Sequence, residues 1–253
     1  MEDSADFSYC NLSNIPDNLS LNLAKLDISI NNLIIIDCSH LPQRLQILFA
    51  HSNKILNIIY NFPIHLKYLN LQRNYLSSLP ELPPVLETLN ISDNCFSEIP
   101  PLPSSLQQLF ADNNSITVIP QSLPESLKDL CLCYNYISNI PESLPKNLEA
   151  ICIEHNQLRG LPETWPESIY IVRANNNPLN SLPSRIPVSV RYFATDSDKI
   201  PPYFPKKIHH IIDILNRESQ KRQIERVRLF KEELMQNRWH PTRVLQLLEN
   251  GEI

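Results

Sequence analysis

The stretch that decides the fold is LPELPPVLETLNISDNCFSEIP (79–100), followed at once by PLPSSLQQLFADNNSITVIP (101–120). Each segment carries the pattern LxxLxLxxNxLxxL, in which L stands for an apolar residue. The asparagine of this pattern recurs along the chain every 20 to 22 residues, at Asn31, Asn53, Asn74, Asn94, Asn114, Asn135, Asn156 and Asn177. A period this regular is typical of structural repeats that stack on one another.

The spacing within one repeat predicts its local structure. The short LxL portion is expected to be a strand, because a period of two sends the leucines inward and the alternate residues outward. Stacked copies then form one parallel sheet on the concave side of a curved solenoid. We expect each asparagine side chain to bond the backbone where the chain leaves the strand, which satisfies buried polar groups. Because no repeat can bury its apolar face alone, neighbouring repeats supply the stability.

Prolines predict the structure of the return segment. A first proline follows the last apolar position of six repeats, at Pro80, Pro100, Pro120, Pro141, Pro162 and Pro183, and a second comes three or four residues later. Two prolines within five residues remove N–H donors and fix φ, which excludes a regular helix. We therefore expect an extended, polyproline-like convex side.

The unit LPxLPxxLxxLxVxxNxLxxLP resembles the short leucine-rich repeats of bacterial type III effectors, the Yersinia outer-protein and Shigella invasion-antigen class. The likeness covers roughly residues 7–204 and implies a β-rich leucine-rich repeat solenoid (α/β by convention) with about eight full repeats and partial ones at each end. Many effectors of this class carry a cysteine-dependent ubiquitin-ligase domain after the repeats. The 55 residues after Asp198 contain no cysteine, so we do not expect that activity.

The composition and the ending RWHPTRVLQLLENGEI (238–253) suggest a second resemblance. An Asn- and Ile-rich chain with a basic helix of this kind is similar to leucine-rich repeat proteins of amoeba-infecting giant viruses. An AT-rich genome of another source would produce the same composition.

The charge balance divides the chain into two regions. Residues 1–198 carry a formal charge of −9 and residues 199–253 a charge of +4. We expect a solenoid over 1–204 and an α-helical segment over 205–253, where apolar residues recur at helical spacing. These helices either cap the open end of the solenoid or bind a partner. Glutamates interleaved among the basic residues argue against nucleic acid as that partner.

The chain shows no sign of export or membrane insertion. It begins MEDSADFSYC, which lacks the basic and apolar regions of a signal peptide. No apolar run approaches the roughly 18 residues of a membrane span. The six cysteines are therefore expected to be reduced thiols. We expect an intracellular, cytoplasmic protein, located in the host cytoplasm if the chain is viral or an effector.

The outward-facing strand residues are the candidate binding site. Counted from the first leucine of each repeat, positions 3, 5 and 7 line the concave wall, which is polar with exposed aromatic side chains. Aromatic residues in a polar setting are typical of energetic anchors at protein interfaces. The sequence thus predicts a non-catalytic protein-binding or scaffolding module whose contact residues include Phe49, Tyr68, Asn70, Phe110, Asp112, Cys131, Glu154 and Arg173.

Catalysis finds no support in the sequence. With glycine only at 160 and 251 a phosphate-binding glycine loop is excluded, and neither a zinc-protease HExxH nor a nucleophile elbow is present. We expect no enzyme activity and no cofactor.

A metal- or redox-responsive protein remains the alternative, centred on Cys131, Cys133, Cys152 and His155. Repeat spacing places Cys152 about one strand spacing (~4.8 Å) from Cys131. A disulfide between adjacent parallel strands has awkward geometry, which favours free thiols. A flat row of strand residues also supplies the tetrahedral ligands of zinc poorly.

Overall fold

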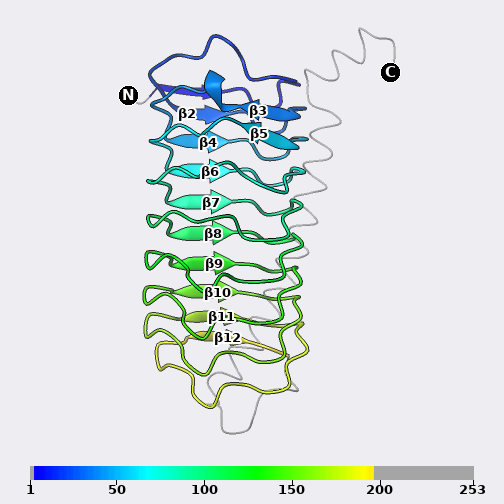
Figure 1. Ribbon diagram of the computed structural model, residues 1–253, viewed down its shortest axis with the longest axis vertical. Helices are drawn as coiled ribbons and strands as arrows, with labels where there is room; N and C mark the ends of the chain where they lie inside the picture. The colour runs from blue at the N-terminus through cyan, green and yellow to red at the C-terminus, as the bar shows by residue number, and fades with distance from the viewer. Residues whose placement is uncertain (1–2, 197–253) are drawn as a thin grey trace, which may run out of the picture. The chain divides into compact units, whose positions relative to one another are not determined.

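The computed structural model describes residues 3–196, which coil into a solenoid whose turns each add one short strand to a common sheet (Figure 1). Ten strands stack in chain order into one parallel sheet. Strands β3 and β5 do not belong to it and pair with each other. Its strands are β1 (Asp3–Asp6), β2 (Leu23–Asp27), β4 (Ile47–Phe49), β6 (Tyr68–Asn70), β7 (Thr88–Asn90), β8 (Gln108–Phe110), β9 (Asp129–Cys131), β10 (Ala150–Cys152), β11 (Ile171–Arg173) and β12 (Tyr192–Ala194). The predicted repeat solenoid is confirmed.

The first strand was not expected from the repeat pattern. Only the second half of a repeat is visible in the sequence over residues 7–15, yet β1 pairs with β2 over DSAD, a segment without a leucine. Asp3 aligns with Leu23, and the register then shifts so that Asp6 aligns with Asp27. Strand β1 has almost no apolar side chain to bury, so backbone hydrogen bonds to β2 hold it in the sheet.

The apolar core lies directly behind the sheet. The middle residue of each three-residue strand of this sheet, from β4 to β12, is an apolar side chain with at most 1% exposure, as in Leu48, Leu109 and Val172. These residues share one position of the repeat and align across neighbouring strands. The alternation predicted from the LxL spacing is present, because the residues on either side of the buried one are half-buried or exposed, apart from Asn70, Ala150 and Ala194.

A ladder of asparagine side chains joins successive turns. In the central repeats, Asn114 Oδ1 accepts the backbone N–H of Phe96 at 2.9 Å, and its Nδ2 donates to the carbonyls of Ile91 and Ala111. The same contacts recur from Asn31 to Asn177. Each asparagine bonds its own turn and the turn before it, which confirms the predicted role of this residue in satisfying buried backbone groups.

The residue before each asparagine adopts a left-handed backbone conformation. Eight such residues have φ between 54° and 57°: Ile30, Ser52, Arg73, Asp93, Asn113, Tyr134, His155 and Asn176. Non-glycine residues pay a steric penalty of about 1–2 kcal/mol in this region. The geometry of the repeat imposes this conformation whatever side chain stands there, so the backbone turns sharply without using glycine.

On the convex side, prolines begin turns and also interrupt regular secondary structure. The second proline of each pair begins a turn in which its carbonyl accepts the N–H of the next repeat's first apolar residue, as between Pro83 and Leu86 at 3.1 Å. From β6 onward, the described convex segments contain neither helix nor strand. The extended convex side predicted from the prolines is confirmed for these repeats.

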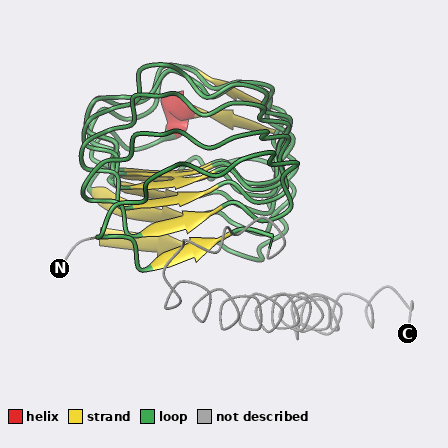
Figure 2. Cartoon of the chain, turned by 90° about the horizontal axis from the view of Figure 1, so that it is seen from below, coloured by secondary structure: helices red, strands yellow, loops and turns green. Residues whose placement is uncertain are grey.

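The first two full repeats depart from that expectation. Their convex segments form a two-stranded parallel sheet of β3 (Ile35–Asp37) and β5 (Asn57–Ile59), followed in the first by a 3-10 helix, η1 (Cys38–His40). Figure 2 shows this pair across the coil from the ten-stranded sheet. Asp37 and Ile59 occupy the position that the first proline holds in later repeats. Without proline, both segments keep the N–H groups that strand pairing requires.

Two further predictions concern the C-terminal segment and membrane-spanning helices. The boundary predicted at residues 204 and 205 and the helices predicted beyond it lie outside residues 3–196. Within that described range, no helix has the length and apolar character needed to cross a membrane.

Candidate functional site: the concave face

We call the solvent-facing side of the ten-stranded sheet the concave face. Strand pairing places position 5 of every repeat in one continuous row across it, because each of these residues aligns with its counterpart in the next strand. In order, the row contains Asp27, Phe49, Asn70, Asn90, Phe110, Cys131, Cys152, Arg173 and Ala194. Seven of these nine are half-buried, while Asn70 and Ala194 are buried. The structure therefore brings together residues up to 167 positions apart in sequence.

Near the N-terminal end, the concave face contains an aromatic cluster. The rings of Phe49 and Tyr68 lie 5.1 Å apart at an angle of 47°. The ammonium group of Lys25 stands 5.3 Å from the centre of the Phe49 ring, within the range of a cation–π contact. Lys25, which the sequence did not single out, thus joins two predicted contact residues. The cluster offers a half-exposed apolar surface with a positive charge at its edge.

Polar side chains occupy the middle of the concave face and form hydrogen bonds with one another. Thr88 donates to Gln108 at 3.1 Å, and Gln108 donates to Asp129 at 2.7 Å. Asn70 uses its Oδ1 to accept the N–H of Gln72 and is only 9% exposed. Its side chain is therefore engaged mainly with its own turn, whereas Phe110 remains half-exposed between the polar groups.

Carboxylates gather along the edge where the chain leaves the strands. Asp93 accepts hydrogen bonds from Gln72 at 2.8 Å and Asn113 at 2.7 Å, and lies 4.0 Å from the Arg73 guanidinium. Repeat spacing did not single out Asp93, because its contacts depend on the left-handed backbone at position 8.

Two predicted contact residues belong to the same edge. Asp112 Oδ1 accepts the backbone N–H of Cys133 at 2.7 Å, and a carboxylate oxygen of Glu154 lies 3.9 Å from the sulfur of Cys133. These carboxylates make this edge of the face acidic.

Three thiols occupy the C-terminal half of the face. Cys131 aligns with Cys152 on the neighbouring strand, Cys152 aligns with Arg173, and all three cysteines are free and half-buried. A hydrogen bond from the Cys131 thiol lowers the pKa of Cys152 and raises that of Cys131, and the Arg173 charge also lowers the pKa of Cys152. Burial, followed by the Asp112 charge, raises the pKa of Cys133. Of these three sulfurs, Cys152 is the one that the surroundings favour as a thiolate.

His155, the fourth residue of the metal hypothesis, is engaged elsewhere. It stands at position 8 with φ of 55°, and its ring stacks on that of Tyr134 at 4.1 Å and 11°. Its Nε2 lies 3.1 Å from the Asn176 amide nitrogen. Within residues 3–196, no three histidine, cysteine, aspartate or glutamate side chains are grouped so that they could hold a metal ion.

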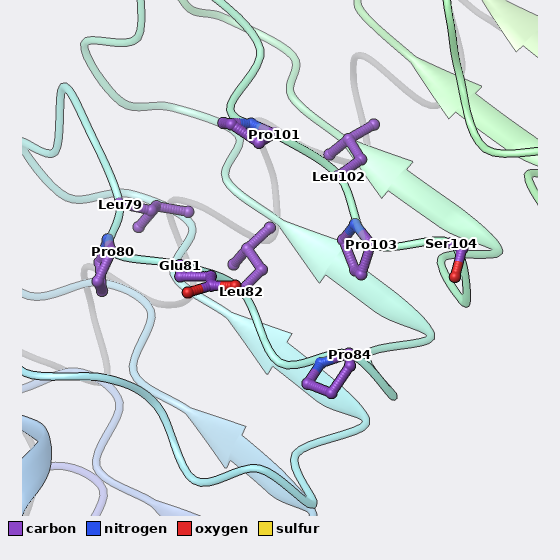
Figure 3. A pocket seen from close by; sticks show the side chains of 9 residues that line it. All are labelled: Leu79, Pro80, Glu81, Leu82, Pro84, Pro101, Leu102, Pro103 and Ser104. Atoms are coloured by element: carbon purple, nitrogen blue, oxygen red, sulfur yellow. The ribbon is translucent and has the colours of Figure 1, made fainter.

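A separate groove lies outside the concave face, between the proline-containing segments of two consecutive repeats (Figure 3). Its volume is about 640 Å³, and its walls consist of Leu79, Pro80, Glu81, Leu82, Pro84, Pro101, Leu102, Pro103 and Ser104. One carboxylate and one hydroxyl among leucines and prolines do not provide the paired groups that acid–base or nucleophilic catalysis requires.

Comparison with known proteins agrees with this architecture. The family model described as Leucine Rich Repeat matches residues 65–84 and 85–106. The chain folds as a leucine-rich repeat solenoid. Its solenoid is similar to YopM from Yersinia enterocolitica, with 30% identity and a TM-score of 0.61 over 77% of this chain. It is also similar to a Shigella effector leucine-rich repeat domain, with 29% identity, a TM-score of 0.54 and coverage of 71% of each chain. The predicted resemblance to bacterial effector repeats is confirmed.

The similarity has limits in length and in sequence. This leucine-rich repeat chain spans 46% of the Yersinia enterocolitica YopM chain. It also covers 40% of the InlJ functional domain from Listeria monocytogenes, at 26% identity and a TM-score of 0.62 over 70% of this chain. That InlJ domain is described as including a cysteine ladder. Comparison with curated protein sequences finds no match.

Proposed function

We propose that this leucine-rich repeat protein is a non-catalytic binding and scaffolding module that holds another protein on its concave face. The observation that carries the proposal is the cluster of Lys25, Phe49 and Tyr68. Two half-exposed rings 5.1 Å apart, with an ammonium group over one of them, stand on a rigid sheet. Aromatic anchors held by a rigid scaffold lose little side-chain freedom on binding.

The rest of the face supports this proposal. Phe110 provides a second half-exposed ring, and the hydrogen-bonded polar groups between the two aromatic sites are already ordered. The acidic edge formed by Asp112 and Glu154, together with Arg173 in the position-5 row, supplies charges that fix the orientation of a partner. Six free cysteines in the chain suit an intracellular location for this module.

The experiment is affinity purification of the intact chain by proximity labelling and pull-down, with single variants Phe49→Ala and Phe110→Ala. Loss of an aromatic anchor is expected to weaken binding of a genuine partner by about tenfold or more. Leu56→Ala and Val118→Ala are matched controls, because both side chains are more than half exposed but lie off the concave face. Equal recovery of every partner by all four variants would contradict the proposal.

A further inference from the structure

The thiols of the concave face are arranged for oxidation chemistry that protein binding does not require. Cys131 and Cys152 are direct partners on adjacent parallel strands, so their Cα atoms are separated by about one strand spacing (~4.8 Å). This separation falls within the range found in disulfides. Both side chains are half-buried rather than sealed in the core, and both sulfurs are free. We propose that Cys152 is a peroxide-reactive thiol and that Cys131 converts its oxidised form into a reversible disulfide across the concave face.

The neighbouring groups assign different roles to the two sulfurs. Cys152 aligns with Arg173 on the next strand, and the guanidinium charge there stabilises a thiolate at Cys152. Cys131 aligns on its other side with Phe110, an aromatic ring rather than a cation. At Cys133, burial and then the nearby carboxylates of Asp112 and Glu154 disfavour a thiolate. Cys152 is therefore the attacking sulfur and Cys131 the resolving one.

The chemistry balances with hydrogen peroxide as the oxidant. The Cys152 thiolate attacks one peroxide oxygen: an S–O bond forms, the O–O bond breaks, and the departing hydroxide takes a proton to become water. The sulfur is oxidised by two electrons and the peroxide is reduced. The Cys131 sulfur then attacks the Cys152 sulfur, so that an S–S bond forms and the S–O bond breaks. The hydroxide that leaves takes the Cys131 proton as a second water.

The geometry also argues that the disulfide is reversible. Side chains at aligned positions of parallel strands project side by side, which is not the relaxed arrangement of a disulfide. A strained and partly exposed disulfide is more easily reduced than a structural one. The oxidised state would draw β9 and β10 together beside Phe110 and change the surface between Phe110 and Arg173.

The test uses the full reduced chain and limiting hydrogen peroxide. Tryptic cleavage places Cys131 and Cys133 in peptide 129–146 and Cys152 in peptide 147–159. Oxidation is expected to link these peptides with a loss of about 2 Da, and dithiothreitol is expected to release them. The link should persist in Cys133→Ser and disappear in Cys131→Ser. In Cys131→Ser, the sulfenic acid trapped by dimedone should accumulate at Cys152.

Two further measurements separate this role from general thiol reactivity. Arg173→Gln is expected to slow peroxide consumption at Cys152 about three- to tenfold near neutral pH, because the thiolate loses its cation. Cys95→Ser, which removes an exposed thiol off the concave face, should leave the rate at Cys152 unchanged. The proposal is overturned if dimedone labels Cys95 or Cys10 before Cys152 in the wild-type chain. A link that survives in Cys131→Ser, or sulfinic acid without any link, overturns it equally.

Discussion

The side chain of Asn135 satisfies the backbone of Ile116, which belongs to the preceding turn of the solenoid. Its Oδ1 accepts the Ile116 N–H at 2.9 Å, while its Nδ2 donates to the carbonyls of Ala111 and Leu132. Asn135 is 5% exposed, so water cannot take over these bonds without opening the repeat. One amide thus connects two turns at the point where the chain leaves β9.

Replacement of Asn135 by alanine should therefore be costly. The change leaves a buried N–H group without a partner and weakens the bonding of two carbonyls, at a cost of about 2–3 kcal/mol in the free energy of unfolding. Asn139→Ala is the matched control, because Asn139 is exposed and its amide donates to the neighbouring Ser138 hydroxyl at 3.2 Å. Its effect should stay within about 0.5 kcal/mol. Urea denaturation of both variants measures the difference, and equal stabilities would contradict the role of the ladder.

At the left-handed position before each ladder asparagine, a substitution is expected to raise the free energy of unfolding instead of lowering it. Ile30 has φ of 54°, a conformation that a β-branched side chain adopts only under strain. Ile30→Asn should raise the free energy of unfolding by up to about 1 kcal/mol, because asparagine tolerates this conformation better. Asn113→Ile makes the reverse change at the equivalent position, where φ is also 54°, and should destabilise the chain.

A control for this pair comes from Ile34, which is 52% exposed and is not among the residues with positive φ. Ile34→Asn should bring no gain, because no strain is relieved there. Stabilities from thermal or urea denaturation decide the point. A gain at Ile34 as large as that at Ile30 would mean that surface polarity, and not backbone strain, produces the effect.

Periodicity predicted the positions of the strands and the order of the concave row. A repeat of 20 to 22 residues determines which side chains align, so the order of the neighbours Phe110, Cys131, Cys152 and Arg173 is predictable from the sequence. The ladder was predictable for the same reason, since a buried asparagine at a fixed position needs backbone partners.

Contacts that depend on local backbone and side-chain conformation could not be predicted in this way. The stack of Tyr134 on His155 follows from left-handed conformations at two successive turns, which directs His155 toward the residues at position 8. The pairing of β3 with β5 follows from the absence of two prolines rather than from a pattern of apolar residues. Repeat spacing specifies alignment, whereas these contacts are set by φ and by rotamers.

Gly160 offers a route to a more stable chain. It lies on the convex side without a positive φ, and a Cβ added there would meet its nearest neighbour, the Ser181 hydroxyl, at an ordinary contact distance of 3.9 Å. Gly160→Ala should raise the free energy of unfolding by about 0.4–1 kcal/mol, chiefly because it restricts the unfolded chain. The same urea titration checks this, with an unchanged denaturant slope expected. A destabilised variant would show that the Gly160 backbone needs the freedom of glycine.

The buried thiol of Cys38 makes stability depend on alkaline pH. Cys38 is 1% exposed in η1, and burial, followed by the Asp37 charge, raises its pKa from 9.0 to about 12. As pH rises, the thiol ionises first in the unfolded chain. Its contribution to stability is therefore complete below pH 9 and declines as pH rises toward 12, by at most about 1.4 kcal/mol per pH unit.

Two alanine variants isolate this contribution. The stability difference between wild type and Cys38→Ala should shrink between pH 9 and 11, because the variant has lost the group that titrates. The corresponding difference for Cys95→Ala, at an exposed thiol, should stay nearly constant over the same range. Urea denaturation at about pH 7.5, 9, 10 and 11 measures both stability differences across the expected titration range. A constant difference for Cys38→Ala would mean that water reaches this thiol and that η1 does not seal it.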